Sequence, residues 1–223
     1  MTNRFLLEIA KNDIRKNLLR FTRRAFGMIS ASDKPRILDI GCGTGVPTLE
    51  LTALCNGHIT AIDNDYEALD ILLTHIEKES LTDRIEILQM NISEINFAPE
   101  SFDIIWSEGS IQFIGFAEGL AAWRKLLAPG GFMAIHADDA SVAERIALIE
   151  ESGFSLTGKF TMSAEIWWSD YFEPLKNLVA KLRKDYANNN AMLKLLEEDD
   201  GNVKMFEADP DCCQSAFYVM QKT

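Results

Sequence analysis

The stretch "ILDIGCGTGVPTLEL", residues 37–51, is the feature of this sequence that most restricts its fold. An apolar run of strand type meets three glycines at alternate positions, and a helical pattern begins directly after them. Pro47 suits the first turn of that helix. Glycine tolerates backbone angles that other residues avoid, and it lets a ligand approach the main chain closely. The stretch therefore predicts a strand, a tight ligand-binding turn and a helix.

Strand-like and helix-like segments alternate along most of the chain. We expect strands at 36–40, 58–63, 84–90, 102–106, 132–137, 154–160 and 215–221. Helices are expected at about 46–55, 66–79, 116–127 and 141–152, and the sequence "APGG" is expected to close the third of them. This alternation favours parallel strands with right-handed crossovers, which form an open, doubly wound α/β sheet.

Two regions fall outside this alternation. Residues 1–30 are expected to form a helical lid, because an apolar side chain recurs every three or four positions: Leu7, Ala10, Ile14, Leu18, Phe21, Ala25 and Met28. A mostly helical, acidic insertion is expected at about 163–213, before the last strand. Residues 31–223, with that insertion, are expected to form the main domain.

The net charge, the short apolar runs and the pattern of Cys and His residues argue against several kinds of binding partner. The formal net charge of −12 argues against nucleic acid, because phosphate binding needs a basic face. No apolar run approaches the roughly 20 residues of a membrane span, and the charged N-terminus lacks the apolar core of a signal peptide. We therefore expect no membrane partner and a cytoplasmic location. Neither CxxC pairs nor a His/Asp cluster with ligand spacing occurs, so no metal is expected.

The identity of the ligand on the glycine turn depends on the residues around it. A nucleoside triphosphate loop needs a lysine after Gly45, and the dinucleotide fingerprint needs a third glycine where Val46 stands. Asp39, two positions before Gly41, would repel a pyrophosphate but attract the cationic end of an amino acid. Asp39 therefore favours S-adenosylmethionine over a dinucleotide.

Asp63 ends the second strand, where its two oxygens can accept both ribose hydroxyl protons. Dinucleotides and S-adenosylmethionine share this feature. Asp63 therefore indicates a nucleoside without choosing between them.

At this point the chain resembles the class I S-adenosylmethionine-dependent methyltransferases. The family pattern is matched by "LDIGCGTG", "AIDND", "FDIIWSEG" and "WRKLLAPGG", over about 35–160 and the final strand. The resemblance implies a Rossmann-like sheet of seven strands, of which the last is antiparallel. "WSEGSIQFIGF" is also similar to a small-molecule subgroup with a W-S-E-G signature, which favours a small acceptor.

The resemblance also implies roles for individual residues. Asp39 and the turn from Gly41 to Gly45 would hold the methionine end, Asp63 the ribose and Asn64 the adenine edge. Asn91 stands where the family usually has an aspartate, and its amide oxygen would accept a hydrogen bond from the adenine amino group. The full expected cofactor set is Asp39, Gly41, Cys42, Gly43, Gly45, Asp63, Asn64, Asn91, Ile92 and Ser107.

Glu108 and His136 are the candidate catalytic residues, because Glu108 follows the fourth strand and His136 lies near the end of the fifth, and both strand ends face the cofactor. A base is needed only where the acceptor carries a proton to be lost. Alternatives stay open: Glu108 also suits a cap or salt bridge, and His136 a satisfied core histidine. The candidate acceptor-binding residues are Glu108, Gln112, Trp167 and Trp168, although the two tryptophans also suit an apolar anchor for the insertion.

The predicted function is transfer of a methyl group from S-adenosylmethionine to a small molecule, with release of S-adenosylhomocysteine. A non-catalytic protein that binds S-adenosylmethionine and an NAD-linked oxidoreductase are the two alternatives. The expected partners are the small-molecule acceptor and, as one option, a second copy of the chain in a homodimer. No motif identifies the acceptor atom as oxygen, nitrogen, sulfur or carbon.

Overall fold

The computed structural model describes residues 2–138 and 142–223. The chain divides into two compact units, which we call the helical unit (1–19 and 162–214) and the sheet unit (20–161 and 215–223). The expected N-terminal lid is thus shared between the units, with the division after residue 19.

The sheet has seven strands in the order β3-β2-β1-β4-β5-β7-β6. Their bounds are Arg36–Ile40 (β1), His58–Asp63 (β2), Ile85–Gln89 (β3), Phe102–Glu108 (β4), Leu127–Asp138 (β5), Phe154–Met162 (β6) and Ser215–Lys222 (β7). Strands β1 to β5 pair in parallel, whereas β7 is antiparallel to β5. The predicted doubly wound sheet with an antiparallel last strand is confirmed.

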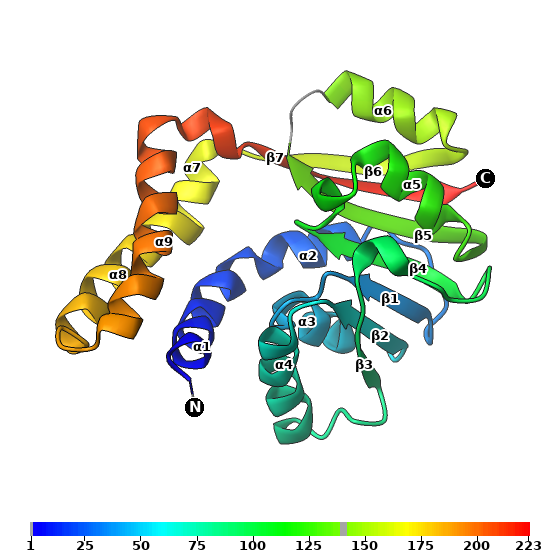
Figure 1. Ribbon diagram of the computed structural model, residues 1–223. Coiled ribbons are helices and arrows are strands. Elements are labelled where there is room, and N and C mark those ends of the chain that lie inside the picture. Colours follow the sequence, from blue (N-terminus) through cyan, green and yellow to red (C-terminus); the bar gives the residue numbers. More distant parts are fainter. Residues whose placement is uncertain (1, 139–141) are drawn as a thin grey trace. The chain divides into compact units, whose positions relative to one another are not determined.

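Helices cover both faces of this sheet (Figure 1). In the sheet unit they are α2 (Leu19–Phe26), α3 (Val46–Leu54), α4 (Tyr66–Lys78), α5 (Phe116–Arg124) and α6 (Val142–Glu151), with short 3-10 turns η2 (Ile92–Glu94) and η3 (Ile111–Phe113). Side chains of α5 and α6 share one core cluster with Leu38, Ile105 and Tyr218 of the sheet. Helices α2, α3 and α4 lie on the other face. The expected start of α6, residue 141, lies outside the described residues.

The start of β5 differs from the sequence prediction. The helix expected over 116–127 ends at Arg124, and the "APGG" segment belongs to the strand. The reason is sheet pairing: Leu127 is buried and pairs with Phe102 of β4, and its carbonyl accepts a hydrogen bond from Lys222 Nζ at 2.6 Å. Tertiary pairing thus overrides the local signal of a helix stop.

The helical unit has its own core. It contains α1 (Asn3–Arg15), η1 (Lys16–Leu18), α7 (Ala164–Trp167), the π-helical turn η4 (Trp168–Phe172), α8 (Glu173–Asp185), α9 (Asn190–Ala208) and η5 (Pro210–Cys213). Leu7 and Ile14 of α1 pack with apolar side chains of α8 and α9. Lys11 on α1 also donates to the buried Asp199 on α9 at 2.7 Å. Of the helices in the described ranges, none is long and apolar enough to cross a membrane.

Candidate cofactor and acceptor site

The glycine turn lies at the carboxyl end of β1, directly before α3. The backbone N–H groups of Gly41 and Cys42 both donate to the carbonyl of Ile62, at 2.8 and 3.0 Å. Gly41, Gly43 and Gly45 all adopt positive φ angles, of 73°, 53° and 80°. These angles turn the chain sharply between strand and helix, as the three glycines predicted.

The turn also packs closely against the loop after β4. The Oγ of Ser110 donates to the carbonyl of Gly41 at 3.3 Å. A Cβ atom at position 41 would lie 2.0 Å from that Oγ, which no real structure tolerates. A side chain at position 41 therefore requires Ser110 or the glycine turn to shift.

Asp63 connects the end of β2 to the glycine turn. Its Oδ2 accepts from the backbone N–H of Gly43 at 2.8 Å, and its Oδ1 accepts from that of Asp65 at 2.9 Å. Each carboxylate oxygen can accept a second hydrogen bond. Asp63 therefore holds the turn in place and keeps the capacity to bind ribose hydroxyls.

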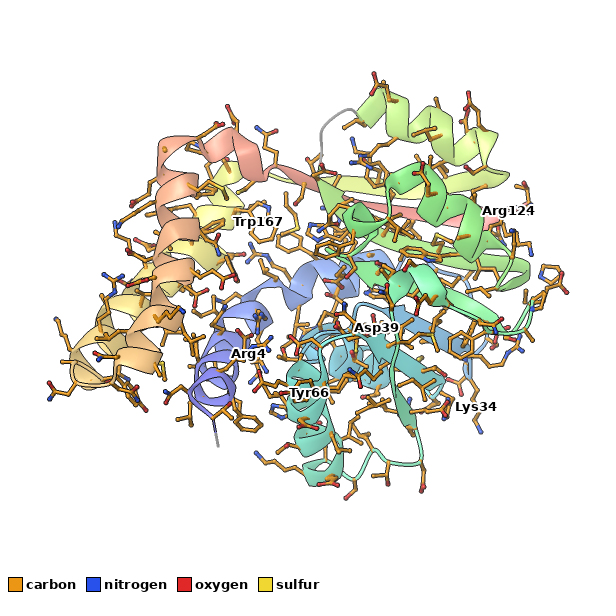
Figure 2. The ribbon with its side chains drawn as sticks, in the orientation of Figure 1. Arg4, Lys34, Asp39, Tyr66, Arg124 and Trp167 are labelled. Atoms are coloured by element: carbon orange, nitrogen blue, oxygen red, sulfur yellow. The ribbon has the colours of Figure 1, made fainter. Side chains whose placement is uncertain are left out.

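Asp39, which is labelled in Figure 2, belongs to β1. It is the most deeply buried carboxyl group of the site, with 2% of its surface exposed. Its Oδ2 accepts from Thr48 Oγ1 on α3 at 2.6 Å. Burial raises the pKa of Asp39 from 3.8 to about 7, and the nearby Glu108 and Asp63 add to the rise. Among the described residues no basic side chain pairs with Asp39. Asp39 does not line the pocket described next, so its contact with a cationic ligand group stays a prediction.

A pocket of about 500 Å³ opens beside the turn. Its wall combines polar groups at strand ends with apolar side chains: Gly41, Ile62, Asp63, Asn64, Met90, Asn91, Ile92, Ser93, Ser110, Phe113 and Ile114. The volume is in the range of ordinary small-molecule sites. The structure thus brings together Gly41, Asp63, Asn64, Asn91 and Ile92 of the expected cofactor set.

The structure adds a constraint at Asn91. Its Oδ1 caps η2 by accepting from both the N–H and the hydroxyl of Ser93, at 3.0 and 2.8 Å. An amide oxygen has two lone pairs, so both are already engaged. The side chain presented to the pocket at this position is therefore a donor, and the expected acceptor role needs Ser93 to move.

The other expected cofactor residues lie outside the pocket wall. Ser107 is fully buried within β4, and its hydroxyl has no partner in the described structure. Cys42 is buried in the turn with its Sγ 3.8 Å from the carbonyl of Gly43. Gly43 and Gly45 contribute to the turn itself, and no contact of theirs with a ligand is established.

Sequence reasoning missed several residues of the wall. Met90 and Ser93 follow β3, whereas Ser110, Phe113 and Ile114 follow β4. Ligands in open α/β sheets bind outside the carboxyl ends of the strands, and this rule applied to every strand would have found them. Phe113 is conspicuous because 77% of its surface is exposed.

Glu108 ends β4 and pairs in register with His136 of β5. Its Oε1 accepts two hydrogen bonds, from Trp106 Nε1 at 2.8 Å and from Thr22 Oγ1 at 2.9 Å. Burial raises the pKa of Glu108 to about 7, although both hydrogen bonds oppose the rise. A carboxyl group that titrates near neutral pH is suited to proton transfer.

His136 is held on the same face of the sheet. Its Nε2 lies 2.8 Å from Ser215 Oγ, and its ring stacks on Phe217 with 4.7 Å between the centroids. Burial lowers the pKa of His136 to about 4, so the ring is neutral at pH 7. This geometry fits the alternative of a satisfied histidine, and a catalytic role for His136 stays a prediction.

The remaining acceptor candidates lie in different settings. Gln112 donates from Nε2 to the carbonyl of Gly109 at 2.6 Å. Trp167 and Trp168 are partly buried and pack against the core of the helical unit, where Trp168 stacks on Phe206 with 5.8 Å between centroids. The tryptophans thus anchor α7 and η4 within their own unit, and their contact with an acceptor stays a prediction.

No group of three or more His, Cys, Asp or Glu side chains in the described part of the chain is arranged to hold a metal ion.

Comparison with known proteins agrees with this geometry. Residues 37–131 match a family model described as a methyltransferase domain. An uncharacterized protein of Synechococcus is 35% identical over 126 residues, which are 52% of this chain and 30% of that protein. A sterol 24-C-methyltransferase of Gibberella zeae is 28% identical over 103 residues, or 45% of this chain and 27% of the enzyme.

This chain thus spans less than a third of the length of either relative. Among solved structures, the [4+2]-cyclase SpnF superposes with a TM-score of 0.76 at 16% identity, over 91% of this chain and 80% of the cyclase. At that identity the superposition shows the fold alone. The strand order, the glycine turn with Asp39 and Asp63, and the matching domain model converge on one assignment: residues 37–131 form a methyltransferase domain, within a sheet of the Rossmann-like methyltransferase fold.

Proposed function

We propose that this protein transfers the methyl group of S-adenosylmethionine to a small molecule and releases S-adenosylhomocysteine. The observation that carries the proposal is the pocket whose wall joins the glycine turn to Asp63 at the carboxyl edge of the sheet. The matched domain model, residues 37–131, includes every residue of that wall.

The residues present fit the cofactor. The positive φ angles at Gly41 and Gly43 expose the backbone for close approach, and Asp63 retains acceptor capacity for two hydroxyls. Apolar side chains of Met90 and Phe113 offer contact surface for a flat base. A cationic amino group near Asp39 would be attracted by a carboxylate that has no basic partner in the described structure.

When bound, S-adenosylmethionine supplies an electrophilic methyl group on a sulfonium. The contribution of the protein is to hold the acceptor in line and to exclude water, which can supply several kcal/mol, roughly 7 or more. For an acceptor with an O–H or N–H group, Glu108 takes the proton on its carboxylate as the acceptor lone pair forms the bond to carbon. The electron pair of the methyl–sulfur bond would remain on the sulfur of S-adenosylhomocysteine, the leaving group. A neutral His136 would orient the acceptor by a hydrogen bond.

The test combines binding with turnover. Calorimetry with S-adenosylhomocysteine establishes the cofactor site, and S-adenosylmethionine labelled in its methyl group is then offered with a panel of amines, phenols, carboxylic acids and thiols. We expect binding by the wild type and labelled product from at least one acceptor class. Glu108→Gln should keep binding and lose turnover for acceptors that must give up a proton.

A second candidate is a protein that binds the cofactor without methyl transfer. The superposition on a cyclase favours considering it, because that protein is named for a different reaction on the same fold. Tight S-adenosylhomocysteine binding without labelled product from the whole panel would favour this candidate. Tight NADH binding instead would revive the oxidoreductase alternative.

Finer features remain proposals from the sequence. They are the W-S-E-G subgroup, the lid role of 1–30 with 163–213, the homodimer and the cytoplasmic location.

A further inference from the structure

Thr22 on α2 is a buried polar residue that sequence reasoning assigned to no role. Only 1% of its surface is exposed, and it lies between the buried Phe21 and the arginine-rich outer side of the helix. Its hydroxyl donates to Glu108 Oε1 at 2.9 Å, across 86 residues of sequence. A buried hydroxyl with a carboxylate partner is a specific contact, because an unpaired one costs free energy.

A second donor reaches the same oxygen. Trp106 lies two positions before Glu108 on β4 and therefore on the same face of the sheet. Its indole N–H donates to Oε1 at 2.8 Å, and its ring is packed against Phe26 of α2 and Phe217 of β7. Both donors thus come from rigid elements, and no donor among the described residues reaches Oε2.

The charged groups around Glu108 are few. Asp39 of β1 lies near enough for the two carboxyl charges to interact, and His136 of β5 is neutral at pH 7. On α2, Arg23 pairs with a carboxylate of α3, and Arg24 stacks over a ring of β6. The hydrogen bonds from Thr22 and Trp106 are therefore the contacts that favour the ionised form of Glu108.

We propose that Thr22 is a positioning residue, which together with Trp106 clamps Oε1 of Glu108 and leaves Oε2 as the oxygen presented to the methyl acceptor. The role of Oε2 as the proton acceptor rests on the proposed function. The clamp itself does not, since it is a property of the free protein. A hydrogen bond to a carboxylate lowers its pKa, so the clamp also keeps more of Glu108 ionised at neutral pH.

The test measures the titration of Glu108 directly. The protein is labelled with ¹³C at the glutamate carboxyl carbons, and Glu108→Gln identifies the resonance of Glu108. Thr22→Val removes the hydroxyl at nearly constant shape, and we expect the pKa of Glu108 to rise by about one unit. Thr22→Ser keeps the donor and should restore the wild-type pKa.

Thr52→Val is the matched control. Thr52 lies on α3 and donates to the carbonyl of Leu49 at 2.7 Å, away from Glu108. This variant reports the general effect of losing a helical threonine hydroxyl, and we expect no change in the pKa of Glu108. Thermal unfolding of all variants shows that each is folded under the conditions of titration.

The outcomes separate the clamp from the proposed function. An unchanged pKa in Thr22→Val overturns the proposal, as does an equal rise in Thr22→Ser or Thr52→Val. With an acceptor in hand, the acid limb of the kcat profile should move upward with the pKa in Thr22→Val. A shifted pKa in a protein that methylates nothing would support the clamp and refute the proposed function.

Discussion

Replacing Gly41 by alanine tests whether the turn and the loop after β4 form one rigid unit. A Cβ at position 41 would lie 2.0 Å from Ser110 Oγ and 2.5 Å from Ser110 Cβ, so the loop or the turn must move. The backbone at Gly41 also has a φ of +73°, which disfavours alanine independently of space. The two costs have different origins and can be separated.

The expected loss of stability in Gly41→Ala is the sum of the conformational cost and the steric cost. The left-handed conformation costs an L-residue about 1–2 kcal/mol. Overpacking at a tight contact costs typically about 1–3 kcal/mol. Gly41→Ala should therefore lower the free energy of unfolding by about 2–5 kcal/mol. It should also weaken S-adenosylhomocysteine binding, because Gly41 and Ser110 both form the pocket wall.

Gly43→Ala is the matched control, because Gly43 has a φ of +53° but no atom lies within 4 Å of the place that an alanine methyl group would take. It should cost only the conformational term, about 1–2 kcal/mol. Urea unfolding of the wild type, Gly41→Ala, Ser110→Gly and Gly41→Ala/Ser110→Gly forms a double-mutant cycle, and Gly43→Ala is measured beside it. The reasoning is refuted if Gly41→Ala and Gly43→Ala lose equal stability, or if Ser110→Gly recovers nothing in the Gly41→Ala background.

Three further predictions concern the carboxyl groups. Asp63→Ala should weaken S-adenosylhomocysteine binding by about 1.5–3 kcal/mol in calorimetry. A ribose-free methionine analogue should also lose affinity, because the backbone N–H of Gly43 loses its hydrogen-bond acceptor, and unchanged affinity for both ligands would contradict this prediction. The pKa of Asp39 is raised to about 7 in the folded protein, so the unfolded chain loses this proton at lower pH and the stability of the free protein should fall as the pH rises from about 4 to 7. Above pH 7, Asp39→Asn should be more stable than the wild type in urea unfolding, by up to about 4 kcal/mol. Equal stability of the two proteins at pH 8 would count against the buried carboxylate. Lys11→Met should lower the free energy of unfolding by about 3–5 kcal/mol, because the carboxylate of Asp199 is left buried and unpaired. The double variant Lys11→Met/Asp199→Asn should lose less stability. Equal losses in the two variants would mean that the unpaired carboxylate is not the cause.

The sheet could be predicted because its signals are local. Each strand of the sheet unit is a short apolar run, and Pro47 falls in the first turn of α3 as expected. The glycine turn and Asp63 are likewise fixed by position relative to strand ends. The start of β5 was missed because "APGG" carries a local stop signal, whereas the pairing of Leu127 with Phe102 depends on a distant strand.

The contacts within the site could not be predicted in the same way. Ser110 meets Gly41 across 69 residues, and Thr22 meets Glu108 across 86. No sequence spacing predicts either contact, because each depends on how a loop or a helix packs against the sheet. Asn91 shows a related limit: its residue type was known, but the capping of η2 that occupies its oxygen depends on Ser93.

In the N-terminal segment, the regular recurrence of apolar residues predicts which side chains are buried, but not which part of the protein they pack against. Its apolar residues recur without interruption across residues 1–29, which predicted one lid. In the structure, Leu7 and Ile14 are buried in the helical unit, whereas Phe21 stacks on Phe160 and Phe26 packs against Trp106 in the sheet unit. Deleting 1–29 would therefore remove Thr22 from Glu108 together with α1. A truncation that asks whether α1 acts as a lid must end at residue 19, where the two units divide, so that the clamp on Glu108 remains.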